Sequence, residues 1–242
     1  MKALVEFIEK YRPGFSEKII PADKFDIALL EEDAGPLPGA YVRFLRTMGT
    51  SMGDLELAEA GFSIDGKIMT YQAMPWLRHG RYIFVAGDRG LASWDYFLDR
   101  SMPYGADDCM VVRMPLEENV APETIHPVHA GFEEFLYYEA FKALRMPLLP
   151  YRRDFSSPVD ISAADRYRSD IVSAVAEENG FKRIPPAKNC ALYERGDAAL
   201  LLYQHPIASA FSFNLGCEDP KEIERLAQDF ETRTGLQDVV VK

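Results

Sequence analysis

LPGAYVRFLRTMG, residues 37–49, carries the clearest helical pattern in the chain. Its large apolar residues follow the i, i+3, i+4, i+7 spacing of one helix face: Tyr41, Phe44, Leu45 and Met48. Pro38 stands near the start, where helices tolerate its missing N–H group, and Gly49 follows the last periodic position. These features predict a helix that buries one face against a core.

The sequence on either side of this helix has a different character. Residues 21–33 fit a short helix or an irregular arm. From residue 62 to residue 112 the pattern shifts toward period two, with turn signals at Asp65-Gly66 and at residues 87–90, and it predicts a sheet. Within it, residues 81–86 and 91–98 predict a hairpin closed by Gly87-Asp88-Arg89-Gly90, and residues 109–114 predict the next antiparallel strand.

A second helix is expected over residues 132–146, closed by Pro147. It has one apolar stripe facing a core, but three aromatic residues form a second apolar face: Tyr137, Tyr138 and Phe141. An ordinary surface helix would be polar there. We therefore expect these three residues to be covered by another domain.

Residues 147–158 contain three prolines and no periodicity, which is typical of a connector. The chain is accordingly expected to hold two domains, residues 1–150 and residues 159–242. The second domain predicts the order α-β-β-β-α-β: a helix opening at Ser162–Asp165, three strands within residues 191–215, a helix after Asp219-Pro220 and a closing strand at residues 239–241. The fold class is α+β, with helices on one side of antiparallel sheets.

Composition excludes several kinds of partner and compartment. Lys and Arg number 27 against 38 Asp and Glu, which gives a net charge of −11 that repels phosphate backbones and anionic lipid surfaces. We therefore expect no direct nucleic-acid ligand. No apolar run approaches membrane-spanning length, and the start of the chain does not resemble an export signal. Three scattered cysteines indicate reduced thiols, so the cytoplasm is the expected compartment.

Motifs for catalysis or cofactors are weak. No G-x-S-x-G nucleophile elbow occurs, and Cys109, Cys190 and Cys217 each lie in an apolar run where an inert buried role is expected. His126 and His129 are interpreted as incidental loop histidines, because no other metal-ligand motif accompanies them. The Gly87–Gly90 turn lacks the lysine and helix of a phosphate-binding loop. We expect no catalytic residue, no metal site and no cofactor.

Acidic residues gather in several short clusters. A solvated surface is their ordinary explanation, and an electrostatic docking face for a basic partner is the alternative. The residues assigned to such a face are Asp54, Glu56, Glu59, Asp88, Trp94, Asp95, Asp107 and Asp108. Alternation along the strand would place Trp94 with Tyr96 on one sheet face and Asp95 with Phe97 on the other, so that one pair is core and the other lines an exposed groove. Core packing is the expected role of any single aromatic residue, Trp76 included.

The helix motif L-P-x-x-Y-x-x-F-L ending at Gly49 resembles the start of the SUKH superfamily. Later features follow in the order of that family: residues 82–90 leading to Trp94–Asp99, then Val111-Val112, then Gly131–Leu136. The resemblance covers about residues 20–146 and leaves residues 159–242 unassigned. Two departures are the extra domain and the short turn at Gly87–Gly90, where members often have a longer one.

The resemblance implies an α+β fold with a mixed or antiparallel sheet backed by helices, no cofactor and function by protein binding. SUKH proteins include bacterial immunity proteins of polymorphic and contact-dependent toxin systems, fungal cell-wall assembly regulators and the Syd proteins. The leading hypothesis is an immunity protein whose acidic surface occludes a basic toxin domain. A scaffold or regulatory adaptor in envelope or stress signalling is the alternative, and an enzyme of unrecognised type ranks third.

Overall fold

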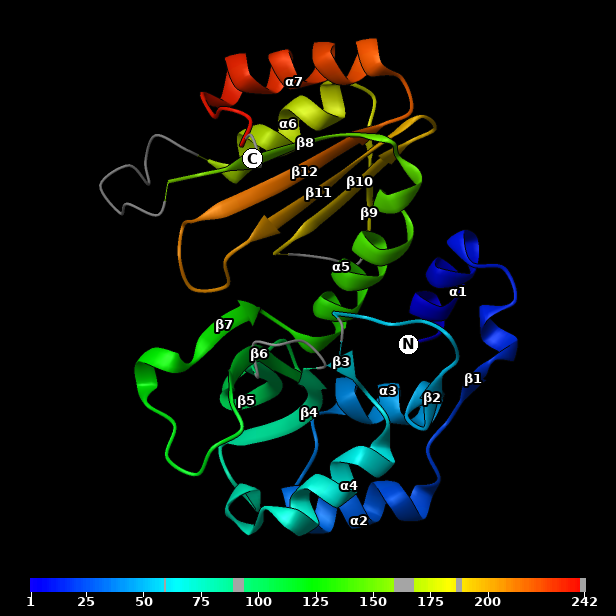
Figure 1. Cartoon of the computed structure of the whole chain (residues 1–242), viewed down its shortest axis with the longest axis vertical. Coiled ribbons are helices and arrows are strands. Elements are labelled where there is room, and N and C mark those ends of the chain that lie inside the picture. Colours follow the sequence, from blue (N-terminus) through cyan, green and yellow to red (C-terminus); the bar gives the residue numbers. More distant parts are fainter. Residues whose placement is uncertain (59, 89–93, 159–167, 186–188, 240–242) are drawn as a thin grey trace. The chain divides into compact units, whose positions relative to one another are not determined.

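The computed structural model describes residues 1–58, 60–88, 94–158, 168–185 and 189–239. These residues have the α+β fold expected from the sequence, with seven α-helices, and twelve strands in three sheets. The chain divides into two compact units, Met1–Leu136 and Tyr137–Lys242 (Figure 1). The division falls inside helix α5 (Phe132–Leu144), earlier in the chain than the boundary expected between residues 150 and 159.

The first unit begins with helix α1 (Lys2–Tyr11), strand β1 (Ile19–Ile20), helix α2 (Lys24–Ala34), helix α3 (Gly39–Met48) and strand β2 (Ser51–Met52). Helix α3 is the one predicted from residues 37–49, and its periodic apolar residues are all buried. The ambiguous segment before it is helix α2, whose start is capped by Asp23 accepting a hydrogen bond from the backbone N–H of Phe25. Strands β1 and β2 form a short antiparallel pair.

The main sheet of the first unit has five antiparallel strands in the order β3-β4-β5-β6-β7. They are β3 (Ala60–Gly61), β4 (Tyr82–Asp88), β5 (Trp94–Tyr104), β6 (Asp108–Pro115) and β7 (His126–His129). The antiparallel pairing of the predicted hairpin is confirmed, because Phe84 of β4 pairs with Phe97 of β5. The predicted turn was wrong at Gly87 and Asp88, which belong to β4. The predicted third strand is confirmed as β6. The turn residues Arg89 and Gly90 lie outside the described part of the chain.

Several sequence expectations in this unit were wrong. Residues 64–73, expected in the sheet, form helix α4 (Ile64–Ala73), followed by a short 3-10 turn at Pro75–Leu77. The buried positions of α4 are Ile64, Lys67 and Tyr71, so a lysine occupies the helical face where the pattern requires an apolar residue. The predicted turn at Asp65-Gly66 lies in the first turn of α4. The presumed loop around His126 and His129 is strand β7.

The two faces of the main sheet pack differently. On one face, Tyr96 contacts Phe135 of α5, with ring centroids 5.3 Å apart. Phe132 of the same helix meets Tyr41 and Phe44 of α3 edge-on, which completes an aromatic core. Because cross-strand partners point to the same side of a sheet, the pairs Phe84–Phe97 and Asp95–Met114 place a different set of side chains on the opposite face.

The second unit is a five-stranded antiparallel sheet in the order β8-β12-β11-β10-β9. Its strands are β8 (Tyr151–Ser156), β9 (Lys182–Ile184), β10 (Ala191–Arg195), β11 (Ala198–Gln204) and β12 (Phe211–Cys217). Helices α6 (Ser169–Glu178) and α7 (Pro220–Thr234) lie side by side over one face (Figure 1). They bury a core that includes Val172, Phe213, Leu215, Leu226 and Phe230.

The predicted order of the second unit is correct for α6, β10, β11, β12 and α7, although the expected start at Ser162–Asp165 lies outside the described residues. Residues 147–158 are not only a connector, because they contain β8, which pairs along β12. The short strand β9 was also not predicted. At the C-terminal end, Asp238 makes an isolated bridge to Phe155 of β8. Of the expected closing strand, only Val239 is described.

Candidate protein-binding site

Asp54 and Glu56, two acids expected on a docking face, are both exposed in the first unit. Asp54 forms ion pairs with Arg12 and Lys18, at 2.7 and 3.4 Å. Desolvation is the largest single effect on the Asp54 pKa and raises it, but a backbone hydrogen bond within Asp54 and the charges of Arg12 and Lys18 together outweigh it, so that the pKa lies below its usual value. Both acids line a cavity of about 350 Å³ beside β2. Glu59 lies outside the described residues.

Asp107 and Asp108 are neighbours with different surroundings. Asp107 is exposed and forms an ion pair with Arg43, whose hydrogen bond lowers the pKa of the Asp107 carboxyl. Asp108 accepts hydrogen bonds from the backbone N–H groups of Phe132 and Glu133, at 2.9 and 3.1 Å, at the start of α5. Burial raises the Asp108 pKa despite these bonds. Asp108 is therefore part of the internal packing and helix capping, and it is not a free docking charge.

The remaining residues of the expected face are Asp88, Trp94 and Asp95. Asp88 lies in β4, opposite Ala60 of β3. Trp94 is half-buried, and its ring packs against the His126 imidazole with centroids 4.3 Å apart. Asp95 is also half-buried.

The alternation expected along β5 was only partly correct. Tyr96 and Phe97 point to opposite sides of the sheet, but both are buried, with 7% and 0% exposure. Both faces of the sheet are therefore covered at this strand. Among the predicted residues that the structure describes, Asp54 and Glu56 line the cavity beside β2, whereas Asp108 is engaged at the start of α5.

Tyr137, Tyr138 and Phe141, expected between domains, are buried and belong to the second unit. The ring of Tyr138 meets Tyr203 of β11 at 5.8 Å. The unexpected second apolar face of α5 is therefore explained in part by packing within the second unit.

The three cysteines are buried free thiols. Burial raises the pKa of the Cys109 thiol to about 12, and it also raises the pKa of Cys217. Since the thiolate is the reactive form, Cys109 and Cys217 are poorly suited to act as nucleophiles at neutral pH.

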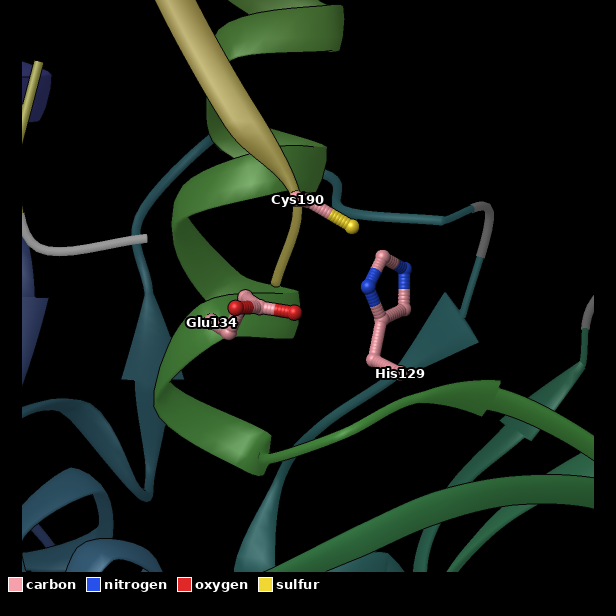
Figure 2. A group of neighbouring side chains, drawn as sticks. All are labelled: His129, Glu134 and Cys190. Atoms are coloured by element: carbon pink, nitrogen blue, oxygen red, sulfur yellow. The ribbon is translucent and has the colours of Figure 1, made fainter. Parts of the chain in front are cut away.

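His129 and Glu134 form a buried polar pair in the first unit that the sequence did not indicate. Figure 2 shows His129 at the end of β7 and Glu134 in the first turn of α5. A ring nitrogen of His129 and a carboxylate oxygen of Glu134 lie within 4.8 Å of each other. His126 is exposed and packs on Trp94, so the two histidines do not converge on one ion. Cys190, also drawn in Figure 2, directly precedes β10 in the second unit.

A small groove on the first unit combines aromatic, apolar and acidic side chains. It encloses about 220 Å³, and we call it the Trp76 groove. Its lining includes Trp76, Leu77, Tyr82, Met114, Glu117 and Glu118. Trp76 is 42% exposed, so the expected core role for this residue was wrong.

Four segments build the Trp76 groove. Trp76 and Leu77 come from the 3-10 turn after α4, Tyr82 opens β4, Met114 lies near the end of β6, and the two glutamates follow β6. The strand register places Tyr82 and Met114 on the sheet face opposite Tyr96. The groove therefore lies on the side of the sheet away from the aromatic core around α5.

The Trp76 groove carries a net negative charge. Arg81 also lines it, but its guanidinium donates hydrogen bonds to both carboxylate oxygens of Asp99. Glu117 and Glu118 are exposed, and neither has a hydrogen bond or ion pair to another described residue. The chain thus presents an exposed indole beside two carboxylates whose charge has no partner in the described structure.

The sequence contained only an indirect signal for the Trp76 groove. Pro75 directly before Trp76 indicates a break in regular structure, where a large aromatic residue has fewer neighbours. The adjacent Glu117-Glu118 pair was visible, but forty residues separate it from Trp76. Their proximity depends on the fold of the sheet.

No helix among the described residues combines the length and apolar character needed to cross a bilayer. Comparisons with family models, curated proteins and solved structures gave no match to this chain.

Proposed function

We propose that this chain is a non-catalytic, cytoplasmic protein-binding protein of SUKH type, which neutralises a basic toxin domain by occluding it. The observation that carries the proposal is the Trp76 groove, where an exposed indole stands beside two carboxylates without described partners. Tryptophan is enriched among the residues that dominate protein-binding energy. An acidic rim attracts a basic partner and raises the rate of association.

The net charge of −11 supports a basic partner in general. The proposed docking surface differs from the acidic face expected from the sequence, because Asp54, Asp107 and Asp108 of that face have partners within the chain. The docking surface is accordingly assigned to the Trp76 groove. The SUKH resemblance rests on four features that occur in the expected order: α3, the β4–β5 hairpin, β6 and α5. This order is compatible with a protein of SUKH type.

The surroundings of the cysteine thiols favour a protein-binding function over a catalytic one. The thiols are buried, and burial raises the pKa of Cys109 and Cys217, which suppresses their reactive form. Reduced cysteines also fit the proposed cytoplasmic location.

The test is neutralisation of a toxin encoded beside this gene. The toxin domain would be expressed in bacteria with and without this chain, and the purified pair would be measured by isothermal titration calorimetry. We expect restored growth and a dissociation constant in the nanomolar range that weakens as salt is added. A Trp76→Ala variant should bind more weakly, whereas a Met69→Ala variant on an exposed side of α4 should not.

Two outcomes would count against the proposal. Absence of binding and protection with every adjacent toxin candidate would reject the immunity role, and pull-down of several host regulators instead would favour an adaptor. Turnover of a small substrate that a folded single-residue variant abolishes would establish an enzyme.

A further inference from the structure

We infer that the Trp76 groove binds one arginine side chain of the partner protein, with its guanidinium against Trp76 and its charge facing Glu117 and Glu118. This inference rests on the proposed protein-binding function and specifies the chemistry of the partner. It commits to a basic protein segment as the occupant.

The size of the groove fits one long side chain. Its volume of about 220 Å³ is below the range of roughly 300–1,000 Å³ typical of small-molecule pockets. Met114 is 4% exposed and contributes an apolar wall, and Leu77 contributes another at 8%. The methylene stem of arginine can lie against such walls while the head group stays at the opening.

Aromatic rings in this part of the molecule already hold guanidinium groups. The Arg81 guanidinium lies over the Tyr82 ring, 4.9 Å from its centroid, at the groove itself. Arg113 lies at the same distance over Tyr96 on the other side of the sheet. Trp76 remains 42% exposed, and indole is the most favourable ring for a cation. A partner arginine can therefore stack on Trp76 without displacing Arg81 from Tyr82.

The charges select a cation for this position. Arg81 is matched by Asp99, at 2.8 and 2.6 Å, so it adds little repulsion toward an incoming cation. Glu117 and Glu118 remain as two carboxylates to accept charge-assisted hydrogen bonds. Arginine fits better than lysine, because its planar guanidinium can stack on a ring and bond a carboxylate along its edge at the same time.

The experiment uses the whole chain and follows its two tryptophans by ¹H–¹⁵N NMR. The probe is the peptide acetyl-Gly-Arg-Gly-amide, and the same peptide with citrulline in place of arginine is the neutral isostere. We expect the arginine peptide to shift the indole N–H signal of Trp76 in a saturable way, with little effect on Trp94, which serves as the internal reference. A Trp94→Phe variant assigns the two signals.

Variants then test which charges matter. The double variant Glu117→Gln/Glu118→Gln should weaken binding of the arginine peptide by about 10-fold or more, the loss expected for one charge-assisted hydrogen bond. The double variant Glu31→Gln/Glu32→Gln changes the net charge equally on the exposed side of α2, and it should leave the affinity within about 2-fold. Equal shifts with arginine and citrulline peptides, or equal losses in both double variants, would overturn the inference.

Failure of the inference is distinguishable from failure of the proposed function. If a toxin is neutralised equally well by the Trp76→Ala and Glu117→Gln/Glu118→Gln variants, the function stands and the groove inference is rejected. If the arginine peptide binds as described but no toxin is bound, the groove stands and the immunity role is rejected.

Discussion

The guanidinium of Arg81 donates two hydrogen bonds to the carboxylate of Asp99, with N–O distances of 2.8 and 2.6 Å. Asp99 also accepts hydrogen bonds from the backbone N–H and the hydroxyl of Ser101. The carboxylate is 4% exposed, whereas Arg81 remains half in solvent. The pair thus joins the start of β4 to β5 directly beside the Trp76 groove.

Replacing Asp99 should destabilise the first unit. Asp99→Asn removes the charge that Arg81 and Ser101 recognise, so we expect a loss of about 1–3 kcal/mol in the free energy of unfolding, measured by urea titration. An Asp65→Asn variant, at an exposed position of α4, is the matched control and should change little. An unchanged urea midpoint for Asp99→Asn would contradict this role.

The ion pair between Arg81 and Asp99 should also make the free energy of unfolding depend on pH in the acidic range. Burial acts to raise the pKa of Asp99, but hydrogen bonds from Arg81 and Ser101 outweigh it and lower the pKa below the ordinary 3.8. This contribution is present above the unfolded-state pKa and disappears as pH falls through the lower folded-state value. Between pH 5 and pH 2, the unsubstituted chain should therefore lose more stability than Asp99→Asn. Parallel urea-stability curves across this range would be the contrary result.

Two adjacent aspartates offer a matched test of helix capping. Asp108→Ala leaves the backbone N–H groups of Phe132 and Glu133 without their acceptor, so it should cost about 1–2 kcal/mol. Asp107→Ala breaks only an exposed ion pair with Arg43 and should cost less than about 1 kcal/mol. Thermal melting measures both variants. Asp108→Asn, which keeps an acceptor, should recover part of the loss, and equal effects of the two alanine variants would reject the cap.

Because of Lys67, the free energy of unfolding of the first unit should be lower at neutral and acidic pH than at alkaline pH. Lys67 is 1% exposed, its Nζ donates a hydrogen bond to the backbone carbonyl of Ser63 at 3.0 Å, and burial lowers its pKa from 10.5 to about 7. Because the folded-state pKa is the lower one, the penalty on the charged form is full below pH 7 and fades as pH rises toward 10.5. From pH 7 to pH 9, the unsubstituted chain should gain about 2 kcal/mol relative to Lys67→Met.

The measurement for Lys67 is urea unfolding at several pH values. Lys2→Met is the control, because the Lys2 side chain is 91% exposed. The stability of this variant should follow that of the unsubstituted chain at each pH. A constant difference between Lys67→Met and the unsubstituted chain from pH 7 to pH 9 would show that the lysine titrates normally.

In the second unit, Glu222 links α7 to β10 by accepting hydrogen bonds from Arg195 and Arg225. These bonds, that from Arg225 foremost, lower the Glu222 pKa from 4.5 to about 2. Since the folded-state pKa is the lower one, the stabilisation is present above pH 4.5 and is lost as pH falls toward 2. Glu222→Gln should cost about 1–2 kcal/mol at pH 7 and less at pH 2. Exposed Glu218→Gln is the control for thermal melts at both pH values.

Local signals predicted much of the fold. Helix α3 and the β4–β5 hairpin have regular periodicity between clear end signals. Helix α7 has Asp219 as its cap, accepting from the N–H of Lys221, and ends at Gly235, whose φ of 72° suits glycine. In each of these elements, residues at the two ends mark in the sequence where the element begins and where it stops.

The elements that were missed depend on tertiary partners. Helix α4 buries Lys67 where an apolar residue was expected, so its periodicity was hidden. Strand β8 is a charged edge strand between prolines, and it is recognisable only from its pairing with β12. In the same way, the capping role of Asp108 and the proximity of Trp76 to Glu117 depend on contacts between distant segments. A single sequence does not encode such contacts as a local pattern.

The bridge between Asp238 and Phe155 has a consequence for self-association. β8 is an edge of its sheet, and unpaired backbone groups on an edge can recruit a strand from another chain. The Asp238 carboxylate accepts from the N–H of Asp154, and the N–H of Val239 donates to the carbonyl of Asp154 at 2.7 Å. Asp238 and Val239 thus occupy backbone groups of the β8 edge that could otherwise pair with a strand of another chain. We expect that deleting these two residues would expose the edge and favour fibril-like or domain-swapped assembly.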